Sequence, residues 1–459
     1  MSIEHFDFLV LGGGSAGYNA AALARKHLPK VAIVDGSEEL GGLCILRGCM
    51  PSKTLLYAAD VLHLASEGHK FGLNIPDPQV DMKALHNRKK QIIGEFASYR
   101  RSQIESDRFS LFRQNGRLGP DRTILLDDGK TIRADRILLS TGSEIAVPGV
   151  PGLAETPTLT SDDILELDSV PESVIVLGGG IVACELAQFL NRIGTKVTMI
   201  QRSPHILSDV EPDMATVLEE SLIDEGIDLF TDTKIVNIES KEKRVSVQFL
   251  FGGRVEVVQA DSLFNALGRK PRTSGLGFET QGIVLRDSGH IQTNECQMTS
   301  LDSVYAAGDC TGPHELVHVA IQQAEVAVRH SLGLEPRPVD YDKILSVIFT
   351  DPQVASIGPP KKDLEKKFGD SLAVADYPFS DHGRSILMEA KRGYVRLYSN
   401  KEDGKIVRAE CVGKDAGELI HSMAVAIGTG ATVQETLEAP WYHPTLSEIW
   451  TYPLEDLAG

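Results

Sequence analysis

The stretch FDFLVLGGGSAG, residues 6–17, decides the fold of the first part of this 459-residue chain. A short apolar run ends in a glycine turn, and Gly12, Gly14 and Gly17 fit the pattern G-x-G-x-x-G. A second apolar run, VAIVD, ends at Asp35, 23 residues after Gly12. Strand, glycine turn, helix and second strand with a terminal carboxylate are typical of the βαβ unit that binds dinucleotides.

The same pattern returns in SVIVLGGGIVACELA, residues 173–187. Gly178, Gly180 and Ala183 fit G-x-G-x-x-A, and the strand VTMI leads to Gln201, again 23 residues after the first glycine of the turn. One glycine pattern often arises by chance, but five features that recur at equal spacing do not. The sequence therefore predicts two dinucleotide-binding folds.

The end of the second strand predicts which nucleotide each fold binds. A backbone without Cβ atoms can approach a pyrophosphate at the helix N-terminus, and a carboxylate after the second strand accepts bonds from ribose hydroxyls. Asp35 therefore favours FAD. Gln201 and Arg202 remove that negative charge and supply a guanidinium, which favours a 2′-phosphate and hence NADP over NAD. If Arg202 is only a solvated surface charge, NAD is the cofactor.

Composition excludes several classes of function. Lys+Arg 46 and Asp+Glu 64 give a formal net charge of −18, so we predict no nucleic-acid partner and no attraction to an anionic membrane. The apolar run at the N-terminus is short and leads into the glycine turn, so we expect no signal peptide, no membrane span and a cytoplasmic location. Six cysteines in so long a chain do not form a secreted disulfide framework.

Two of these cysteines lie close together in GGLCILRGCMPSKTLL, residues 41–56. In an unbroken helix, Cα atoms five residues apart are about 8.6 Å from each other, whereas a disulfide needs less than about 7 Å. Cys44 and Cys49 can pair only if the helix is interrupted, and Gly48 suits a backbone irregularity there. Pro51 suits the first turn of a helix, and a helix N-terminus beside Cys49 stabilises a thiolate. A redox pair is favoured over a zinc site, which lacks further ligands at metal spacing, and over inert packing.

The order of patterns along the chain predicts an α/β protein with two Rossmann-like dinucleotide-binding domains and a separate C-terminal α+β domain. Beyond about Tyr341, the sequence pattern changes from βαβ units to short strands and turns. We expect an FAD-binding domain over residues 1–146 with 273–340, a nucleotide-binding domain over residues 147–272 between these two parts, and a further domain over residues 341–459.

With these features in place, the chain resembles the flavoprotein disulfide reductases, the class I pyridine nucleotide-disulfide oxidoreductases, and within them most closely the dihydrolipoamide dehydrogenases. The resemblance covers nearly the whole length and rests on motifs that occur in the order used by that family: GGGSAG, GGLCILRGCMPSK, STGS, GGGIVACE, ALGRKP, AAGDC and HPTLSE.

The resemblance assigns roles to the residues around the cysteines. Cys44 is similar to the thiol that exchanges with substrate, and Cys49 to the thiol packed against the flavin ring. Lys53 resembles the lysine near the flavin, which pairs with a glutamate matched by Glu185. Further cofactor contacts are implied for residues in the STGS, ALGRKP and AAGDC motifs: Gly142, Gly268, Gly308 and Asp309.

The motif HPTLSE implies an acid/base group, because each thiolate that leaves a disulfide must be protonated or held as an ion. His443 is expected to carry the proton, and Glu448 to orient its other ring nitrogen. In the family these residues reach the disulfide of the partner subunit. The resemblance therefore implies a homodimer with shared active sites. It also implies that the C-terminal α+β domain, residues 341–459, is the dimerisation domain.

The substrate is the least determined feature. The resemblance favours a dithiol/disulfide oxidoreductase acting on dihydrolipoamide, on a lipoyl-bearing protein or on another small disulfide. CILRGC and Gln201 depart from the usual lipoamide pattern, which leaves an NADPH-dependent reductase of another disulfide, similar to glutathione reductase, as an alternative. A further alternative is an NAD(P)H oxidase or transhydrogenase with an idle disulfide. Mercuric ion reduction is disfavoured, because His443 is present and LEDLAG has no cysteine pair.

Overall fold

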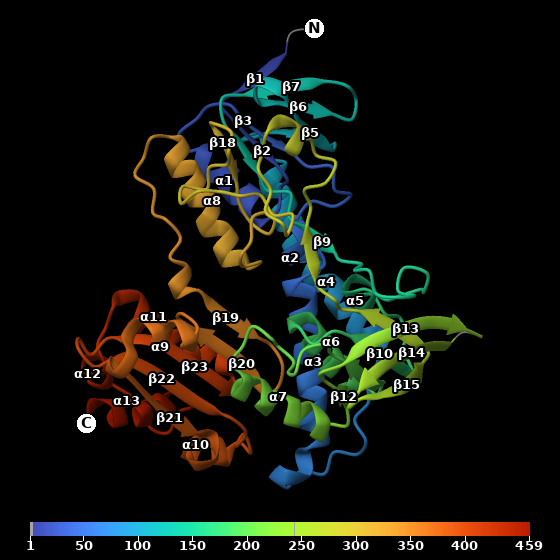
Figure 1. Cartoon of the computed structure of the whole chain (residues 1–459), viewed down its shortest axis with the longest axis vertical. Helices are drawn as coiled ribbons and strands as arrows, with labels where there is room; N and C mark the ends of the chain where they lie inside the picture. Colours follow the sequence, from blue (N-terminus) through green and yellow to red (C-terminus); the bar gives the residue numbers. More distant parts are fainter. Residues whose placement is uncertain (1–2, 243) are drawn as a thin grey trace. The chain divides into compact units, whose positions relative to one another are not determined.

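A computed structural model describes residues 3–242 and 244–459 (Figure 1). The chain divides into two compact units, each built from three segments of sequence. The first unit contains Met1–Thr54, His86–Ala146 and Gly268–Val339. The second contains Leu55–Leu85, Val147–Leu267 and Asp340–Gly459. The three domains expected from sequence, one of them formed by two segments, stay a prediction.

The centre of the first unit is a five-stranded parallel sheet in the order β18-β8-β2-β3-β4. Its elements, with the two helices that cover it, are β2 (Phe8–Leu11), β3 (Val31–Val34), β4 (Ser110–Phe112), β8 (Ile137–Leu139), β18 (Val304–Ala306), α1 (Ser15–Ala24) and α8 (Val317–Ser331). Successive side chains of a strand point to opposite faces. Phe8 and Val10 accordingly pack with α1 and α8, and Leu9 and Leu11 pack on the other face.

That other face is covered by a small sheet in the order β1-β7-β6-β5, in which β6 pairs antiparallel with β5 and β7 while β1 and β7 are parallel. Its strands, with a separate two-stranded pair, are β1 (Glu4–Phe6), β5 (Gly116–Gly119), β6 (Thr123–Leu126), β7 (Thr131–Ala134), β9 (Ser143–Ile145) and β17 (Arg269–Pro271). Helices α2 (Gly42–Leu46), α3 (Cys49–Ser66) and α4 (Met82–Ile104) follow the first βαβ unit, and α3 and α4 contribute residues to both compact units.

The second unit repeats the parallel arrangement in a four-stranded sheet with the order β12-β11-β10-β16. An antiparallel sheet, β13-β14-β15, packs beside it through a shared apolar core. The elements are β10 (Ser173–Leu177), β11 (Lys196–Ile200), β12 (Asp228–Phe230), β13 (Lys234–Lys241), β14 (Arg244–Phe251), β15 (Arg254–Ala260), β16 (Ser262–Asn265), α5 (Ser161–Leu165), α6 (Ile181–Arg192) and α7 (Pro212–Asp224).

The last part of the second unit is an antiparallel sheet in the order β19-β20-β23-β22-β21. Trp450 is fully buried against this sheet and donates its indole N–H to the Leu419 carbonyl oxygen at 3.1 Å. The elements are β19 (Leu345–Ile348), β20 (Gln353–Ile357), β21 (Leu372–Pro378), β22 (Tyr394–Asn400), β23 (Ile406–Gly413), α9 (Lys361–Phe368), α10 (Gly383–Leu387), α11 (Ala416–Thr429), α12 (Val433–Leu437) and α13 (Thr451–Ala458).

The parallel sheet of the first unit, the parallel sheet of the second unit and the C-terminal antiparallel sheet confirm the predicted fold class. This class has two Rossmann-like α/β folds and a C-terminal α+β fold. No helix within residues 3–242 and 244–459 is long and apolar enough to cross a membrane.

Candidate active site

The first glycine loop joins β2 to α1 and leaves room for a ligand. A Cβ atom on Gly12, whose φ is +102°, would lie 2.3 Å from the Ser140 carbonyl oxygen, and one on Gly17 would lie 1.8 Å from the Gly12 carbonyl oxygen. A Cβ atom on Gly14 would meet nothing within 4 Å, and no side chain caps the N-terminus of α1. Open space in front of uncapped helix N–H groups fits the diphosphate of a dinucleotide.

Asp35 follows β3 and is fixed beside this loop. Its Oδ2 accepts a hydrogen bond from the Gly13 N–H at 2.8 Å, and its Oδ1 accepts one from the Ser37 N–H at 2.9 Å. Two backbone donors therefore hold the carboxylate at the end of the strand, where a ribose would lie. The donor set of this loop fits FAD.

Two further predicted cofactor residues lie in the same unit, after β18. The N–H of Gly308, whose φ is +83°, donates to Gln323 Oε1 at 2.7 Å. Asp309 Oδ2 accepts from the Ser143 hydroxyl at 2.7 Å, and Arg269 Nε donates to that hydroxyl at 2.8 Å. The remaining two glycines also adopt positive φ angles, +73° for Gly142 and +104° for Gly268.

The helix that carries the two cysteines is broken, as the sequence predicts. Helix α2 ends at Leu46, Arg47 has φ −142°, and α3 begins at Cys49. A Cβ atom on Gly48 would lie 3.0 Å from the Leu43 carbonyl oxygen and 3.2 Å from the Cys44 Cα, so glycine favours the close approach here, and its φ is not positive.

Cys44 and Cys49 are both thiols in this structure, and their side chains are in hydrogen-bond contact. That contact and burial raise the pKa of the Cys44 thiol, while Lys53 lowers it. The break between α2 and α3 thus brings the two predicted redox sulfurs together.

Lys53 and Glu185 lie in different compact units, Lys53 on α3 and Glu185 on α6. Glu185 is 3% exposed, and its Oε1 accepts a hydrogen bond from the Phe349 N–H at 2.9 Å. Their pairing stays a prediction.

The second glycine loop joins β10 to α6 and has the same backbone form as the first. A Cβ atom on Gly178, whose φ is +108°, would lie 2.6 Å from the Ala266 carbonyl oxygen, whereas one on Gly180 would meet nothing within 4 Å. After β11, Gln201 donates to the His205 carbonyl oxygen at 3.3 Å and accepts from the Arg202 N–H at 3.1 Å. The Arg202 side chain belongs to an exposed residue at the strand end.

His443 and Glu448 form the pair expected from HPTLSE. His443 Nδ1 is 3.0 Å from both carboxylate oxygens of Glu448. The His443 side chain is 80% exposed, whereas that of Glu448 is 10% exposed. A buried carboxylate therefore orients an imidazole whose other ring nitrogen is available to a reacting group.

Sequence reasoning missed His382, which lies behind Glu448. His382 is fully buried, and its Nε2 is 3.5 Å from Glu448 Oε1 while its Nδ1 is 2.8 Å from the Ser385 hydroxyl oxygen. Burial lowers the pKa of His382, against the opposing effect of Glu448. The sequence signal is weak, because the histidine lies 66 residues before Glu448 and only the fold brings them together.

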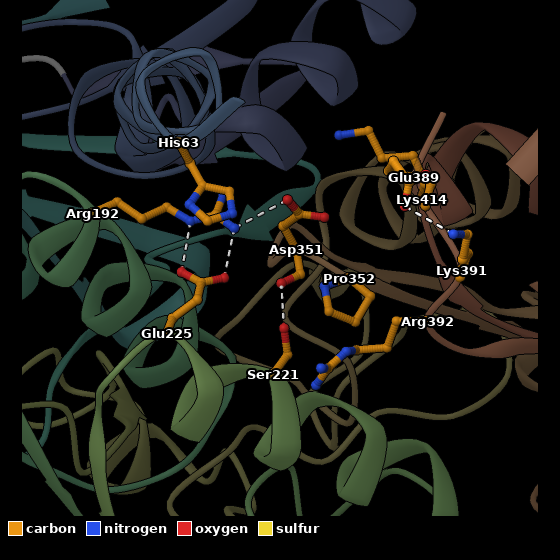
Figure 2. A pocket seen from close by; sticks show the side chains of 11 residues that line it. His63, Arg192, Ser221, Glu225, Asp351, Pro352, Glu389, Lys391, Arg392 and Lys414 are labelled. Carbon is orange, nitrogen blue, oxygen red and sulfur yellow. Dashed lines mark hydrogen bonds and ion pairs between the residues drawn. The ribbon is translucent and has the colours of Figure 1, made fainter. Parts of the chain in front are cut away.

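A pocket of about 130 Å³ lies elsewhere in the second unit, around Arg192 (Figure 2). The Arg192 side chain, 3% exposed, forms ion pairs with Asp60 at 2.6 Å, Glu225 at 2.7 Å and Asp351 at 3.0 Å. Opposite charges satisfy the buried guanidinium on all sides, so this cluster reads as structural. It contains none of the residues predicted for the active site.

Two dinucleotide-binding folds and two cysteines in contact define a class of protein: oxidoreductases that bind two nucleotide cofactors and react through thiols. Residues 6–324 match the family profile described as pyridine nucleotide-disulphide oxidoreductase, and residues 344–453 match the dimerisation domain of the same family. The chain belongs to the pyridine nucleotide-disulphide oxidoreductase family. Membership implies FAD and a pyridine nucleotide, and the dimerisation domain supports a homodimer.

Relatives of the chain carry two different names. A dihydrolipoyl dehydrogenase from Chlamydia muridarum is 32% identical over 451 residues, 97% of this chain and 96% of the relative. A mercuric reductase from Staphylococcus aureus is 31% identical over 444 residues, 96% of this chain and 81% of the relative. The crystal structure of LpdA from Mycobacterium tuberculosis is similar with a TM-score of 0.88 and 26% identity, covering 99% of this chain and 100% of that one.

Proposed function

We propose that the chain is an FAD-dependent oxidoreductase that passes two electrons between a nicotinamide nucleotide and a disulfide through Cys44 and Cys49. The favoured substrate is dihydrolipoamide or a protein-bound lipoyl group, in keeping with the names of several relatives. The observation that carries the proposal is the break between α2 and α3, which places two thiols five residues apart in contact.

The thiol chemistry needs only the two cysteines and a proton carrier. In the reductive direction the Cys44 thiolate attacks one substrate sulfur, the first substrate thiol leaves with a proton, and a mixed disulfide remains on Cys44. Cys49, as thiolate, attacks the Cys44 sulfur, the second substrate thiol leaves with a proton, and a Cys44–Cys49 disulfide forms. The substrate has gained two electrons and two protons, and the cysteine pair has lost them. In the oxidative direction every step is reversed.

His443 carries the protons in this scheme. The Glu448 carboxylate accepts a hydrogen bond from Nδ1, which leaves Nε2 to donate to a departing thiolate or to accept from an entering dithiol. Because His443 is so exposed, it suits a group that reaches another molecule. This exposure supports active sites shared between the subunits of the homodimer.

Bound FAD would supply two-electron transfer between the nicotinamide nucleotide and the cysteine pair. Gly12, Gly14, Gly17, Asp35 and Asp309 would hold it in the first unit. Lys53 and Glu185 would form an ion pair near its ring.

The second glycine loop would bind the nicotinamide nucleotide, and NADPH is favoured over NADH. The support is the uncharged Gln201 at the end of β11 and the exposed Arg202 beside it. The same two residues favour a second candidate function, an NADPH-dependent reductase of a disulfide other than lipoamide.

The test is an anaerobic titration with one equivalent of NADPH or dithionite. A long-wavelength charge-transfer band between a thiolate and flavin is expected in the wild type and in Cys296→Ala, a control cysteine outside the site. Cys49→Ala should lose the band. A wild type without the band, or Cys49→Ala with an unchanged one, would contradict the proposal. A panel of lipoamide, protein-bound lipoyl groups and glutathione disulfide then identifies the substrate.

A further inference from the structure

One cation in the first unit has a buried nitrogen that no described residue satisfies. Arg100 lies on α4, and its Nη1 has no hydrogen-bond partner within the described part of the chain. No carboxylate in that part forms an ion pair with it. Arg100 as a whole is half-buried. A partly buried guanidinium without a counter-ion is in an unfavourable state, which an approaching anion relieves.

Arg100 is held in place by an aromatic ring. Its guanidinium carbon lies 3.9 Å from the centroid of the Tyr18 ring, and the Tyr18 hydroxyl donates to Gln103 Oε1 at 3.3 Å. Stacking fixes the plane of a guanidinium while leaving its N–H groups at the edge free to bind.

The stacked pair of Arg100 and Tyr18 lies near α2, the helix that carries Cys44. The Tyr18 N–H donates to the Gly14 carbonyl oxygen at 2.9 Å, so Tyr18 is one helical turn beyond Gly14. A Cβ atom on Gly42 would lie only 2.7 Å from the Gly14 Cα, and Cys44 follows Gly42 by two residues. Arg100 and Cys44 are close enough that a Cys44 thiolate raises the pKa of Arg100, although burial lowers that pKa overall.

We propose that Arg100 is a substrate-binding residue that selects disulfides carrying a carboxylate near the sulfur atoms. This inference rests on the proposed function, because it assigns the substrate class of the Cys44 thiol. A planar guanidinium binds a carboxylate through its N–H groups, which orients the substrate and supplies the counter-charge that Arg100 lacks among the described residues. A stacked cation that served packing alone would not distinguish an anionic substrate from a neutral one.

The experiment compares matched disulfides that differ only in charge. The first pair is 3,3′-dithiodipropionate and bis(2-hydroxyethyl) disulfide, and the second is lipoate and lipoamide. In Arg100→Gln the ratio of kcat/KM for the anionic member to that for the neutral member should fall about tenfold for at least one pair. Arg101→Gln, an exposed neighbour on α4, should leave both ratios within twofold of wild type. Arg100→Lys should keep part of the preference.

Three results separate the possible failures. An unchanged ratio in Arg100→Gln, or an equal fall for both members of each pair, would overturn the inference but leave the thiol chemistry intact. A wild type that turns over no disulfide and shows no charge-transfer band would overturn the proposed function itself. If Arg100→Gln loses flavin or unfolds, the salt dependence of the wild type provides the test. The wild-type kcat/KM for the anionic disulfide should fall with added salt, while that for the neutral disulfide stays constant. An equal salt dependence for both would overturn the inference.

Discussion

The two glycine loops have the same backbone form but differ at the third position of the motif. In the first loop a Cβ atom on Gly17 would lie 1.8 Å from the Gly12 carbonyl oxygen. In the second loop the matching residue is Ala183, which is fully buried and accommodates its methyl group. The comparison teaches that the same glycine motif allows two distances between the helix and the turn before it. The last residue of the motif, glycine or alanine, indicates which distance is present.

The loops differ again at the end of the second strand. Asp35 is charged and held by backbone N–H groups beside the first loop. Gln201 is uncharged and bonds to backbone groups of its own turn, so that Arg202 provides the charge at this end. The backbone therefore makes both sites suitable for a dinucleotide, and the side chains decide which one binds.

The largest expected effect comes from His443, which belongs to neither glycine loop, so the difference between the loops does not determine it. His443→Gln should lower kcat/KM for dithiol oxidation by about 10²- to 10⁴-fold, because the proton carrier is lost. Reduction of bound flavin by the nicotinamide nucleotide should remain near the wild-type rate in stopped-flow measurements. Unchanged dithiol turnover in this variant would mean that His443 is not the acid/base group.

The second prediction exchanges the residues that distinguish the loops. Gly17→Ala should destabilise the protein by about 3 kcal/mol and lower its flavin content, because the new methyl group clashes with a backbone oxygen. Ala183→Gly should cost only about 1 kcal/mol, the difference in helix propensity. Urea unfolding and flavin absorbance measure both effects. Equal losses in the two variants would contradict the difference between the loops.

The third prediction tests the charge at the end of β11. Arg202→Glu should lower the ratio of kcat/KM for NADPH to that for NADH by about tenfold or more, because a carboxylate repels the 2′-phosphate. Arg254→Glu, an exposed arginine on β15, is the control and should leave the ratio near the wild-type value. A wild type that strongly prefers NADH would reverse the assignment of this loop.

The smallest effect concerns His382, a buried partner of Glu448 that neither loop contacts. Burial lowers the pKa of His382, so the folded protein binds fewer protons there than the unfolded chain. The free energy of unfolding should therefore decrease as the pH falls below about 6.5.

His382→Asn should reduce that decrease and slow dithiol oxidation by a few-fold, because Glu448 loses a neighbour that orients it. Urea unfolding at pH 5 and pH 8, together with the pH profile of kcat/KM, measures both. An identical pH dependence of stability in wild type and variant would show that His382 does not titrate on unfolding.

Local patterns carried most of what could be predicted. The two βαβ units and the break near Gly48 depend on residues close together in the sequence, where spacing fixes geometry. The contact between His443 and Glu448 was expected from the resemblance of HPTLSE to the family motif. Lys53 and Glu185 remain a prediction, because they belong to different compact units.

The rest depends on contacts between distant segments. His382 meets Glu448 across 66 residues, and Arg100 meets Tyr18 across 82 residues. Neither contact leaves a periodic pattern in the sequence, because a single buried histidine or arginine looks like any other polar residue until the fold gives it a neighbour. Gly48 shows a subtler difference: its position was predicted, but its role is close approach and not an unusual φ.

The position of Gly48 also divides residues 44–49 into a part whose backbone is constrained and a part whose side chains can vary. In the turn between the cysteines, a methyl group on Gly48 would crowd Cys44 at 3.2 Å, whereas the side chains of Ile45, Leu46 and Arg47 are partly or fully exposed at the end of α2. Mutation can therefore alter the surface presented to substrates at these three positions without moving the sulfur atoms. Under the proposed function, substrate contacts and redox chemistry occupy the same six residues, yet they can evolve separately.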